Sequence, residues 1–357
     1  MYNNILVKSE VMEHLRKYND QELFYQQYSL IHQDKEALRS FLEQYNPAEL
    51  RKSRIYLEEL LPKAYAEFEG EESMWDNQEA SISIEKYCRY MPYLSAIHNF
   101  FEIVYIVDHS MDIDIGGNSI PLQSGDICLI SPGTLHCPQV REHTIALQMI
   151  VRKSTFHQEF FRCLTGSSLL SEFFLNALYL QNAGSVILFH MKSDEEIKNV
   201  FFQMYLENFN KNIGYQNIMN NLFEILLCYL LRCDASNIEL KQTCPKSDHR
   251  ITQILQYIEN HCERITVADI SEKFHLSKSY LSKYITQKTG KSFSYILQEI
   301  RLEKARKMLC SSNLRVEDVS EAVGYHNVEH FIRLFKNKYV KTPNQFRKEK
   351  YSHPNKL

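Results

Sequence analysis

The last hundred residues contain the same helical pattern twice, and this duplication constrains the fold more than any other feature of the chain. The first copy covers residues 267–290 and the second covers 316–339. In each copy, apolar residues three and four positions apart define one short helix and then another. Ser277 and Asn327 stand between the helices and can cap the second one. The pattern predicts two helix-turn-helix units within an all-α domain over residues 249–350.

The second helix of each unit presents a polar, partly basic face opposite its apolar positions. Such a helix fits the major groove of DNA. Arg333 can read guanine through two parallel hydrogen bonds. For each residue taken singly, a solvated helix face without a partner is the alternative interpretation. The candidate DNA-binding residues are Ser279, Ser282 and Lys283 in the first unit and Glu329, His330, Arg333 and Lys336 in the second.

Charge is distributed unevenly along the chain, although the formal net charge is only −3. Residues 246–357 hold 21 of the 41 Lys and Arg and 12 of the 44 Asp and Glu, which gives +9. The other 20 basic and 32 acidic residues give −12 for residues 1–245. A basic C-terminal third attached to an acidic body is expected when one domain contacts a polyanion such as double-stranded DNA.

Residues 250–350 resemble the DNA-binding domain of the AraC/XylS family of bacterial transcription regulators. The resemblance is carried by LSKSYLSKYITQKTGKSFSYILQEIRLEKARKML at 276–309 and by VEDVSEAVGYHNVEHFIRLFKNKYVKTPNQFRK at 316–348. It implies seven helices, two recognition helices in adjacent segments of the major groove, and an activator of transcription that has RNA polymerase as a further partner. Two residues depart from the family pattern: Val340 replaces the usual Gly after the second recognition helix, and His275 stands where a smaller residue is common.

Residues 81–152 follow a different pattern, in which short runs rich in β-branched and aromatic residues alternate with Gly-containing turns. About six such runs at this spacing predict a small antiparallel barrel or sandwich. A further run at 185–190 can add one strand. The segment resembles the cupin-like sensor domain of many AraC-type regulators, through HNFFEIVYIV at 98–107, Gly-Asp at 125–126 and SPGTLH at 131–136. We therefore expect a small cupin-like β-barrel with flanking helices.

The cupin resemblance implies that His98, Glu102 and His136 converge inside the barrel, while Ala96 replaces a further His found in metal cupins. We expect these three residues to hydrogen-bond a small-molecule effector, and we predict neither a metal nor another cofactor. A three-ligand metal site is one alternative, because zinc and iron sites can use three protein ligands. A barrel without any ligand is the other.

Composition and pattern together predict a multidomain α+β protein. With 44% hydrophobic and 24% charged residues, the chain is globular rather than fibrous or disordered. An apolar stripe that includes Leu222 and Ile225 suits either a homodimer contact or the core. The expected domains are a helical N-terminal extension at 1–80, an effector-sensing domain at 81–190, a helical dimerisation segment at 191–233, a linker at 234–248 and the DNA-binding domain at 249–350.

Several other classes of protein are excluded by the sequence. No apolar run approaches the roughly 20 residues that span a bilayer, and the N-terminus does not have the pattern of a signal peptide. The nine cysteines include no CxxC pair, which favours reduced thiols in the cytoplasm. No GxSxG, Walker or dinucleotide motif occurs, so no catalytic residue is predicted and the protein is not expected to be an enzyme.

The sequence therefore predicts a cytoplasmic transcription regulator whose C-terminal domain binds DNA and whose β-rich domain senses an effector. The family resemblance implies carbohydrate metabolism as the commonest setting. A cupin metalloenzyme with a DNA-binding tail and a DNA-binding protein without a ligand are the alternative functions.

Overall fold

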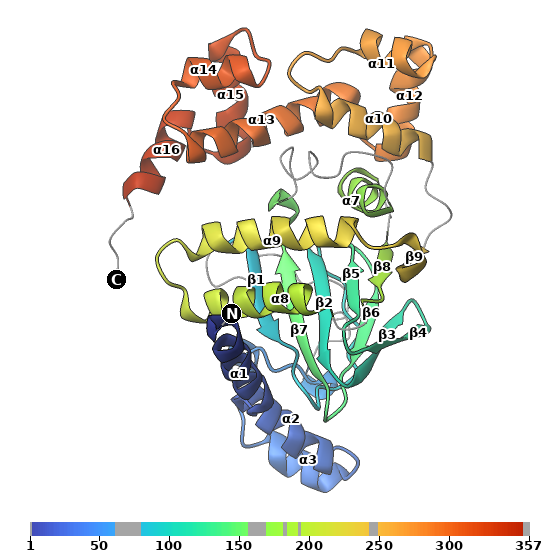
Figure 1. Ribbon diagram of the computed structural model, residues 1–357, viewed down its shortest axis with the longest axis vertical. Helices are drawn as coiled ribbons and strands as arrows, with labels where there is room; N and C mark the ends of the chain where they lie inside the picture. The colour runs from blue at the N-terminus through green and yellow to red at the C-terminus, as the bar shows by residue number, and fades with distance from the viewer. Residues whose placement is uncertain are drawn as a thin grey trace. The chain divides into compact units, whose positions relative to one another are not determined.

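The computed structural model consists of two compact units. The N-terminal unit contains residues 1–155 and 182–246, and the C-terminal unit contains residues 156–181 and 247–357. The predicted α+β class is confirmed, because the described strands belong to the first unit and both helix-turn-helix pairs belong to the second (Figure 1). The residues that the structure describes are 2–60, 80–155, 169–180, 184–191, 194–242 and 249–352.

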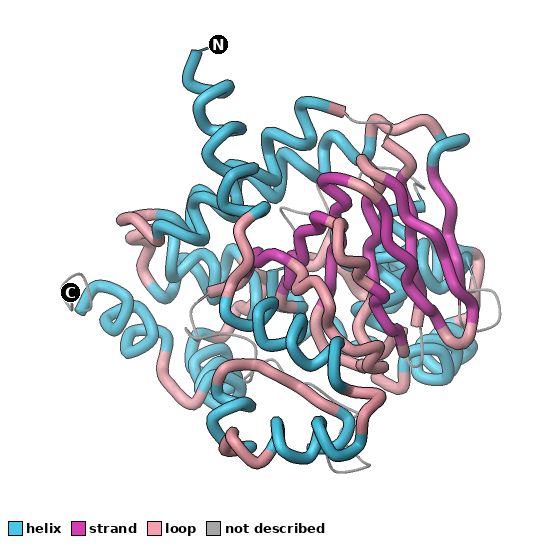
Figure 2. The backbone as a smooth tube through the Cα atoms, turned by 90° about the horizontal axis from the view of Figure 1, so that it is seen from below, coloured by secondary structure: helices cyan, strands magenta, loops and turns pink. Residues whose placement is uncertain are grey.

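The described strands of the N-terminal unit form two antiparallel sheets (Figure 1 and Figure 2). The larger sheet contains, in spatial order, β1 (Ile82–Lys86), β7 (Ile145–Val151), β2 (Phe101–Asp108), β5 (Ile127–Ile130), β8 (Ser185–Phe189) and β9 (Ile238–Gln242). The smaller sheet contains β4 (Asn118–Gln123), β3 (Ser110–Ile115) and β6 (His136–Gln139).

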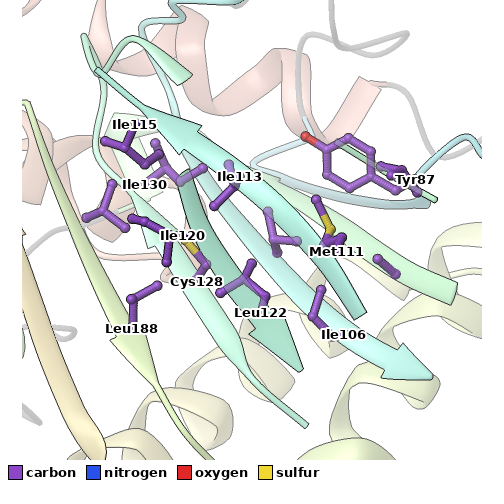
Figure 3. Packing of buried hydrophobic residues seen from close by; sticks show 14 residues of the cluster. Tyr87, Ile106, Met111, Ile113, Ile115, Ile120, Leu122, Cys128, Ile130 and Leu188 are labelled. Carbon is purple, nitrogen blue, oxygen red and sulfur yellow. The ribbon is translucent and has the colours of Figure 1, made fainter. Parts of the chain in front are cut away.

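An apolar core lies between the two sheets and is built from fourteen buried side chains (Figure 3). Val104 and Cys128 reach it from the larger sheet, and Met111 and Ile113 reach it from the smaller one. Removing this apolar surface from water supplies the main favourable term for folding of the unit. The same face of β2 also carries Glu102, because side chains two positions apart in a strand point to one side.

The expected β-barrel is not closed, since the strands are divided between two sheets, as in the sandwich that the pattern also allows. The chain leaves the larger sheet directly after β2, where the pairing with β7 shifts register between Ile106 and Asp108. His109 follows with a φ of 62°, in the left-handed region. Such an irregularity bends a strand and interrupts its pairing. The chain thereby enters β3 of the smaller sheet, and the continuous pairing that a barrel requires is broken.

The β-rich pattern of residues 81–152 is confirmed by β1, β2, β3, β5 and β7, and the further run at 185–190 is confirmed by β8. The sequence pattern does not predict β4, β6 or β9, and each of these three lies at the edge of its sheet. β4 contains Pro121, β6 contains Pro138, and β9 carries Glu239 and Lys241. Edge strands tolerate proline and charge because one side of their backbone needs no partner strand.

The linker predicted at 234–248 is therefore wrong for residues 238–242, which form β9 and pair with β8. A polar composition suggests a linker, but here it belongs to an edge strand, and main-chain groups of that strand hydrogen-bond to β8. Residues 243–248 of the predicted linker lie outside the described residues.

Two helices cover the outer face of the larger sheet, α8 (Glu195–Asn210) and α9 (Tyr215–Leu231) (Figure 1). The ring of Phe201 on α8 stacks on Tyr105 of β2, with 4.3 Å between ring centroids. On α9, Phe223 and Leu226 are buried, whereas Ile218 and Ile225 are 42% and 44% exposed. The apolar stripe of α9 thus belongs partly to the core and partly to the surface.

The N-terminal extension is helical over most of its described part, and residues 61–79 of it lie outside the described residues. Glu22 is fully buried and accepts hydrogen bonds from Lys86 and from Nε of Arg89, the latter at 2.7 Å. These ion pairs fix the extension to the end of β1. The helices are α1 (Tyr2–Arg16), α2 (Asp20–Ile31), α3 (Lys35–Leu42) and α4 (Pro47–Lys52), followed by a 3-10 turn at Glu58–Leu60.

Helix α7 (Leu169–Tyr179) packs against α10 (His249–Asn260) within the C-terminal unit. The Thr252 hydroxyl donates to Oδ1 of Asn176 at 2.9 Å, and the Tyr179 hydroxyl donates to Glu259. The sequence places this stretch in the domain predicted at 81–190. Asn176 and Tyr179 of α7 instead hydrogen-bond to side chains of α10. The spacing of apolar residues within a helix cannot predict such contacts, because they join residues far apart in the chain.

The other helices of the C-terminal unit follow one another along the chain. Among the described residues of the whole protein, no helix is both long enough and apolar enough to span a membrane. The remaining helices are α11 (Val267–Phe274), α12 (Lys278–Thr289), α13 (Phe293–Ser311), α14 (Val316–Ala322), α15 (Val328–Tyr339) and α16 (Pro343–Ser352).

Candidate nucleic-acid interface and buried polar cluster

The first helix-turn-helix unit comprises α11 and α12. Thr266 and Asp269 form a reciprocal capping box at the start of α11, which satisfies two otherwise unpaired main-chain donors. The helix ends at His275, whose φ of 52° is left-handed. Ser277 then begins α12 by accepting a hydrogen bond from the main-chain N–H of Tyr280 at 3.2 Å. Local sequence therefore defines both ends of the turn.

The structure separates the two faces of α12 as the sequence predicts. Leu281 and Ile285 are fully buried. Ser279, Ser282 and Lys283 are exposed, and Ser282 and Lys283 both lie one turn on from Ser279, on the same face. The hydroxyls and the ammonium group are therefore available to a partner, while the opposite face holds the helix in the core.

The second unit comprises α14 and α15. Asn327 begins α15 through its Oδ1 atom, which accepts from the main-chain N–H of His330 at 2.9 Å. Phe331 and Phe335 are fully buried. Nη2 of Arg333 lies 3.0 Å from Nδ1 of His330, so these two side chains form one polar group on the surface. The residues of this unit predicted to contact DNA are all exposed, and they are Glu329, His330, Arg333 and Lys336.

Helix α13 connects the two helix-turn-helix units, and it is fixed to the segment that precedes the first unit and to the last helix of the second (Figure 1). On one side, Nε of Arg301 donates to the main-chain carbonyl of Cys262 at 2.7 Å. On the other, the Tyr339 hydroxyl at the end of α15 donates to Oε2 of Glu303 at 2.6 Å. Lys338 is held by an ion pair with Glu299 at 3.1 Å, which occupies its ammonium group. The second recognition helix, α15, is thus held against α13.

A second candidate site lies in the N-terminal unit, where His98, Glu102 and His136 come together as the sequence predicts. All three are buried, with 3%, 1% and 2% of their surface exposed. Oε2 of Glu102 lies 2.8 Å from Nε2 of His98 and 3.0 Å from Nε2 of His136. One nitrogen or oxygen atom from each residue lies within 4.8 Å of the others.

Two further residues complete this buried polar cluster, which we define as His98, Glu102, His136, Tyr87 and Gln148. The Tyr87 hydroxyl donates to Oε1 of Glu102 at 2.6 Å, and Nε2 of Gln148 donates to the same atom at 2.9 Å. Sequence reasoning missed both donors. Tyr87 directly follows β1 and Gln148 lies in β7. Only the pairing of β1 with β7, and of β7 with β2, brings them to Glu102.

The cluster perturbs the ionisation of its members. Burial lowers the pKa of His98 because it disfavours the imidazolium, and the hydrogen bond to Glu102 only partly offsets this. Burial alone raises the pKa of Glu102, yet the charge and hydrogen bond of His136, together with those of His98, lower that pKa well below its usual value. Glu102 is therefore ionised at neutral pH. Ala96, which replaces the further cupin His, forms an isolated β-bridge with His136.

Comparison with known proteins agrees with the helix-turn-helix geometry. The model of a family described as "Helix-turn-helix domain" matches residues 270–349. The transcriptional activator RhaS of Citrobacter koseri is 27% identical over 258 residues, which cover 70% of this chain and 86% of that protein. The C-terminal domain belongs to the AraC/XylS family. The Xylose operon regulatory protein of Escherichia coli K12 is 32% identical over 145 residues, which cover 38% of this chain and 37% of that protein.

Among solved structures, the C-terminal domain of the response regulator yesN from Fusobacterium nucleatum is 33% identical. The match covers 28% of this chain and 99% of that one, with a TM-score of 0.27. The RhaS and xylose operon proteins are transcription regulators by name, and neither is named as an enzyme.

The AraC-type domain keeps its caps at the two positions that depart from the family pattern. His275 is exposed and has a φ of 52° at the end of α11. Val340 has a φ of 63° at the end of α15, and its side chain is 82% exposed. A β-branched residue is rare in the left-handed region, because its side chain crowds the main chain. The AraC-type turn therefore forms at Val340 at a cost in strain.

Proposed function

We propose that this protein is a DNA-binding transcription activator of the AraC/XylS type, in which seven exposed residues on α12 and α15 contact an operator. The observation that carries the proposal is the exposure of those polar and basic side chains on two capped helices joined by α13. Arg333 reads a guanine, with His330 orienting its guanidinium at 3.0 Å. Lys283 and Lys336 contact phosphate oxygens.

The charge of the chain supports this division of roles. The net +9 of residues 246–357 attracts the phosphate backbone, and the net −12 of residues 1–245 keeps the other part of the chain away from it. A regulator that contacts DNA only through its C-terminal domain needs such an asymmetry. We propose the bacterial cytoplasm as its location, because the chromosome is there.

We further propose that a small-molecule effector controls DNA binding through the cupin-like N-terminal unit. The buried polar cluster supports this role, since polar groups converging in an apolar interior are typical of binding sites. The relatives named above include a xylose operon regulatory protein, which supports a carbohydrate as the effector. The coupling is expected to change operator affinity by about 5- to 150-fold.

We also propose that the protein is a homodimer whose subunits meet through α9. The two side chains that support this are Ile218 and Ile225, which lie seven positions apart on one helical face and are 42% and 44% exposed. Ile225→Glu is expected to convert the dimer to a monomer in sedimentation experiments, and an unchanged mass would contradict the α9 contact. RNA polymerase is the expected further partner of the DNA-bound activator.

Selection from a random DNA library tests the central proposal. The full chain is expected to enrich duplexes with two defined segments about 10.5 base pairs apart, one for each recognition helix. A variant that combines Lys283→Ala with Arg333→Ala should lose the enrichment. Arg39→Ala removes an exposed arginine of α3 in the other unit and should retain it. No enriched sequence with the unmodified chain would contradict the proposal.

A further inference from the structure

We infer that Tyr325 is a positioning residue for base recognition by Arg333, because its ring holds His330 and His330 holds the guanidinium. Tyr325 lies in the turn of the second helix-turn-helix unit, outside the set of residues predicted to contact DNA. The inference rests on the proposed DNA-binding function and adds a determinant of its specificity. Three contacts connect Arg301 of α13 to Arg333 through the two rings.

The main chain of Tyr325 is fixed on both of its sides. Its N–H donates to the carbonyl oxygen of Ser320 at 2.9 Å, and its carbonyl oxygen accepts from the Ser320 hydroxyl at 3.1 Å. Ser320 belongs to α14 and is fully buried. Gly324 directly precedes Tyr325 and supplies the left-handed turn, with a φ of 90°. The Tyr325 side chain therefore starts from a defined position beside α14.

The ring of Tyr325 is held by two further residues. Cζ of Arg301 lies 5.5 Å from the ring centroid, within the range of about 6 Å for a cation–π contact. Arg301 is itself fixed, because its Nε and Nη2 atoms donate to the main-chain carbonyls of Cys262 and Glu263. The ring of Phe331, which is fully buried, lies 5.6 Å from that of Tyr325 between centroids. The orientation of the Tyr325 ring is therefore set by the core and by α13.

The hydroxyl group of Tyr325 does not contribute to this arrangement. The oxygen is buried, and no residue in the described part of the chain forms a hydrogen bond with it. Burial raises the pKa of Tyr325 to about 12, so the hydroxyl carries no charge at neutral pH. The inferred role therefore belongs to the ring alone, and a phenylalanine at this position should perform it.

The imidazole of His330 packs against the Tyr325 ring. The two centroids are 6.1 Å apart and the planes meet at 66°, which is an edge-to-face arrangement. Aromatic pairs are favourable in this arrangement at about 4.5–7 Å. The main-chain N–H of His330 is fixed as well, because it donates to Oδ1 of Asn327 at 2.9 Å. The imidazole is thus restrained although the residue as a whole is exposed.

His330 in turn restrains Arg333, since Nη2 of the guanidinium lies 3.0 Å from Nδ1 of the imidazole. A guanidinium nitrogen only donates, so Nδ1 accepts and the hydrogen of the neutral imidazole is on Nε2. The guanidinium has five N–H donors, and the others remain available to guanine. An exposed arginine that is not restrained loses conformational entropy when it binds a base. Tyr325 therefore reduces this cost from a position behind the reading residue.

Discrimination between operators tests the inference. The operator is the sequence that the full chain selects, and the base pair of interest is the one at which Arg333→Ala loses discrimination. Tyr325→Leu should reduce discrimination there by about 2- to 10-fold, because Arg333 is no longer restrained. The dependence of affinity on salt should stay the same, since no phosphate contact is lost. In the Arg333→Ala background, Tyr325→Leu should not reduce the discrimination further.

Two control variants separate positioning from a loss of packing. Tyr325→Phe keeps the ring and should retain full discrimination. Phe346 is, like Tyr325, a partly buried aromatic residue packed on the core of the second unit, and its ring contacts Phe335 and Tyr339. Phe346→Leu should lower the urea midpoint but retain discrimination. Unchanged discrimination in Tyr325→Leu, or an equal loss in Tyr325→Phe or Phe346→Leu, overturns the inference.

A measurement without DNA distinguishes this inference from the proposed function. Carbon-13 relaxation of the His330 ring, with His330→Ala identifying its signal, reports how well the imidazole is ordered. In the unmodified chain the ring should be as ordered as the main chain of α15, a result that needs no variant to fold. The order should fall in Tyr325→Leu and persist in Tyr325→Phe. A disordered His330 ring in the unmodified chain, or an equally ordered one in Tyr325→Leu, overturns the positioning role, whereas failure of the unmodified chain to select any DNA contradicts the proposed function.

Discussion

Arg301 and Cys262 are joined by a 2.7 Å hydrogen bond from Nε of the guanidinium to the main-chain carbonyl. Nη2 of Arg301 also donates to the carbonyl of Glu263 at 3.2 Å. These bonds fix α13 to the segment that follows α10. The turn of the second helix-turn-helix unit, at Gly324, packs against the same segment. The position of the second recognition helix therefore depends on this small contact.

Gly324→Ala is expected to destabilise the C-terminal unit strongly. Gly324 has a φ of +90°, and a Cβ atom there would lie 2.2 Å from the carbonyl oxygen of Glu263. A main-chain atom cannot move aside as a flexible side chain can, so we expect a loss of about 3 kcal/mol or more in the free energy of unfolding. Urea unfolding followed by circular dichroism measures it.

Gly117→Ala is the matched control for this substitution. Gly117 has nearly the same φ, +88°, but a Cβ atom there would meet nothing within 4 Å. It should show only the conformational cost of about 1–2 kcal/mol. Equal losses for the two variants would mean that the close approach to Glu263 has no energetic consequence.

Val340→Gly is expected to stabilise the protein. Glycine adopts the left-handed conformation without strain, and the valine side chain is 82% exposed, so little packing is lost. Relief of about 1–2 kcal/mol of strain is partly offset by about 0.5–1 kcal/mol from the freer unfolded chain. Val340→Asn should also be stabilising, because asparagine tolerates this conformation. A lower urea midpoint for both variants would show that Val340 is not strained.

The stability of the C-terminal unit is expected to fall as pH rises from about 4 to 7. Burial raises the pKa of Glu259 to about 7, more than the hydrogen bond from Tyr179 and the charges of Lys307 and Lys304 lower it. In the unfolded chain a glutamate titrates near pH 4.3, so the folded state holds this proton more tightly. The protonated Glu259 therefore contributes its full stabilisation below about pH 4.3. As pH rises from there to about 7, the free energy of unfolding falls by about 3 kcal/mol.

Glu259→Gln isolates this contribution, since the amide keeps the shape of the side chain and does not titrate. Urea unfolding at pH 5 and pH 8 should give a smaller difference for the variant than for the unmodified chain. If both lose the same stability between these pH values, Glu259 is not the group responsible.

Arg333→Ala and Lys336→Ala are expected to change DNA binding in different ways, although both remove a positive charge from the exposed side of α15. Loss of a base contact at Arg333 should reduce discrimination at one base pair by about 1–3 kcal/mol. Loss of a phosphate contact at Lys336 should weaken binding to all sequences and reduce the salt slope by about 1. Binding measured over a range of salt on matched and altered operators distinguishes them, and identical effects would contradict the base-reading role of Arg333.

Much of the C-terminal unit was predictable from its sequence. The caps at Ser277 and Asn327 form as expected, and the polar and apolar positions of α12 and α15 divide between surface and core. A helix is built from hydrogen bonds and side-chain contacts between residues three and four positions apart. The ends and the buried face of a helix are therefore determined by residues close to it in the sequence.

Less of the N-terminal unit could be predicted, because strand pairing joins residues that are far apart in the chain. The pattern indicates the inner strands, but β4, β6 and β9 have the proline and charge of edge strands, and their sequences look like loops. The division into two sheets depends on the register shift before His109 and on the left-handed φ of that residue. The alternation of apolar and polar residues in the sequence does not predict either feature.

The sequence by itself determined the two helix-turn-helix units, their exposed residues and the convergence expected of His98, Glu102 and His136. Only the tertiary structure decided that Tyr87 and Gln148 orient Glu102, and that α7 packs against α10. The physical reason is the sequence separation of the residues that interact. Contacts between near neighbours set the ends and faces of helices. The register of β1, β2 and β7 and the partners of buried polar groups depend on residues far apart in the chain, so they are fixed only when the whole chain has folded.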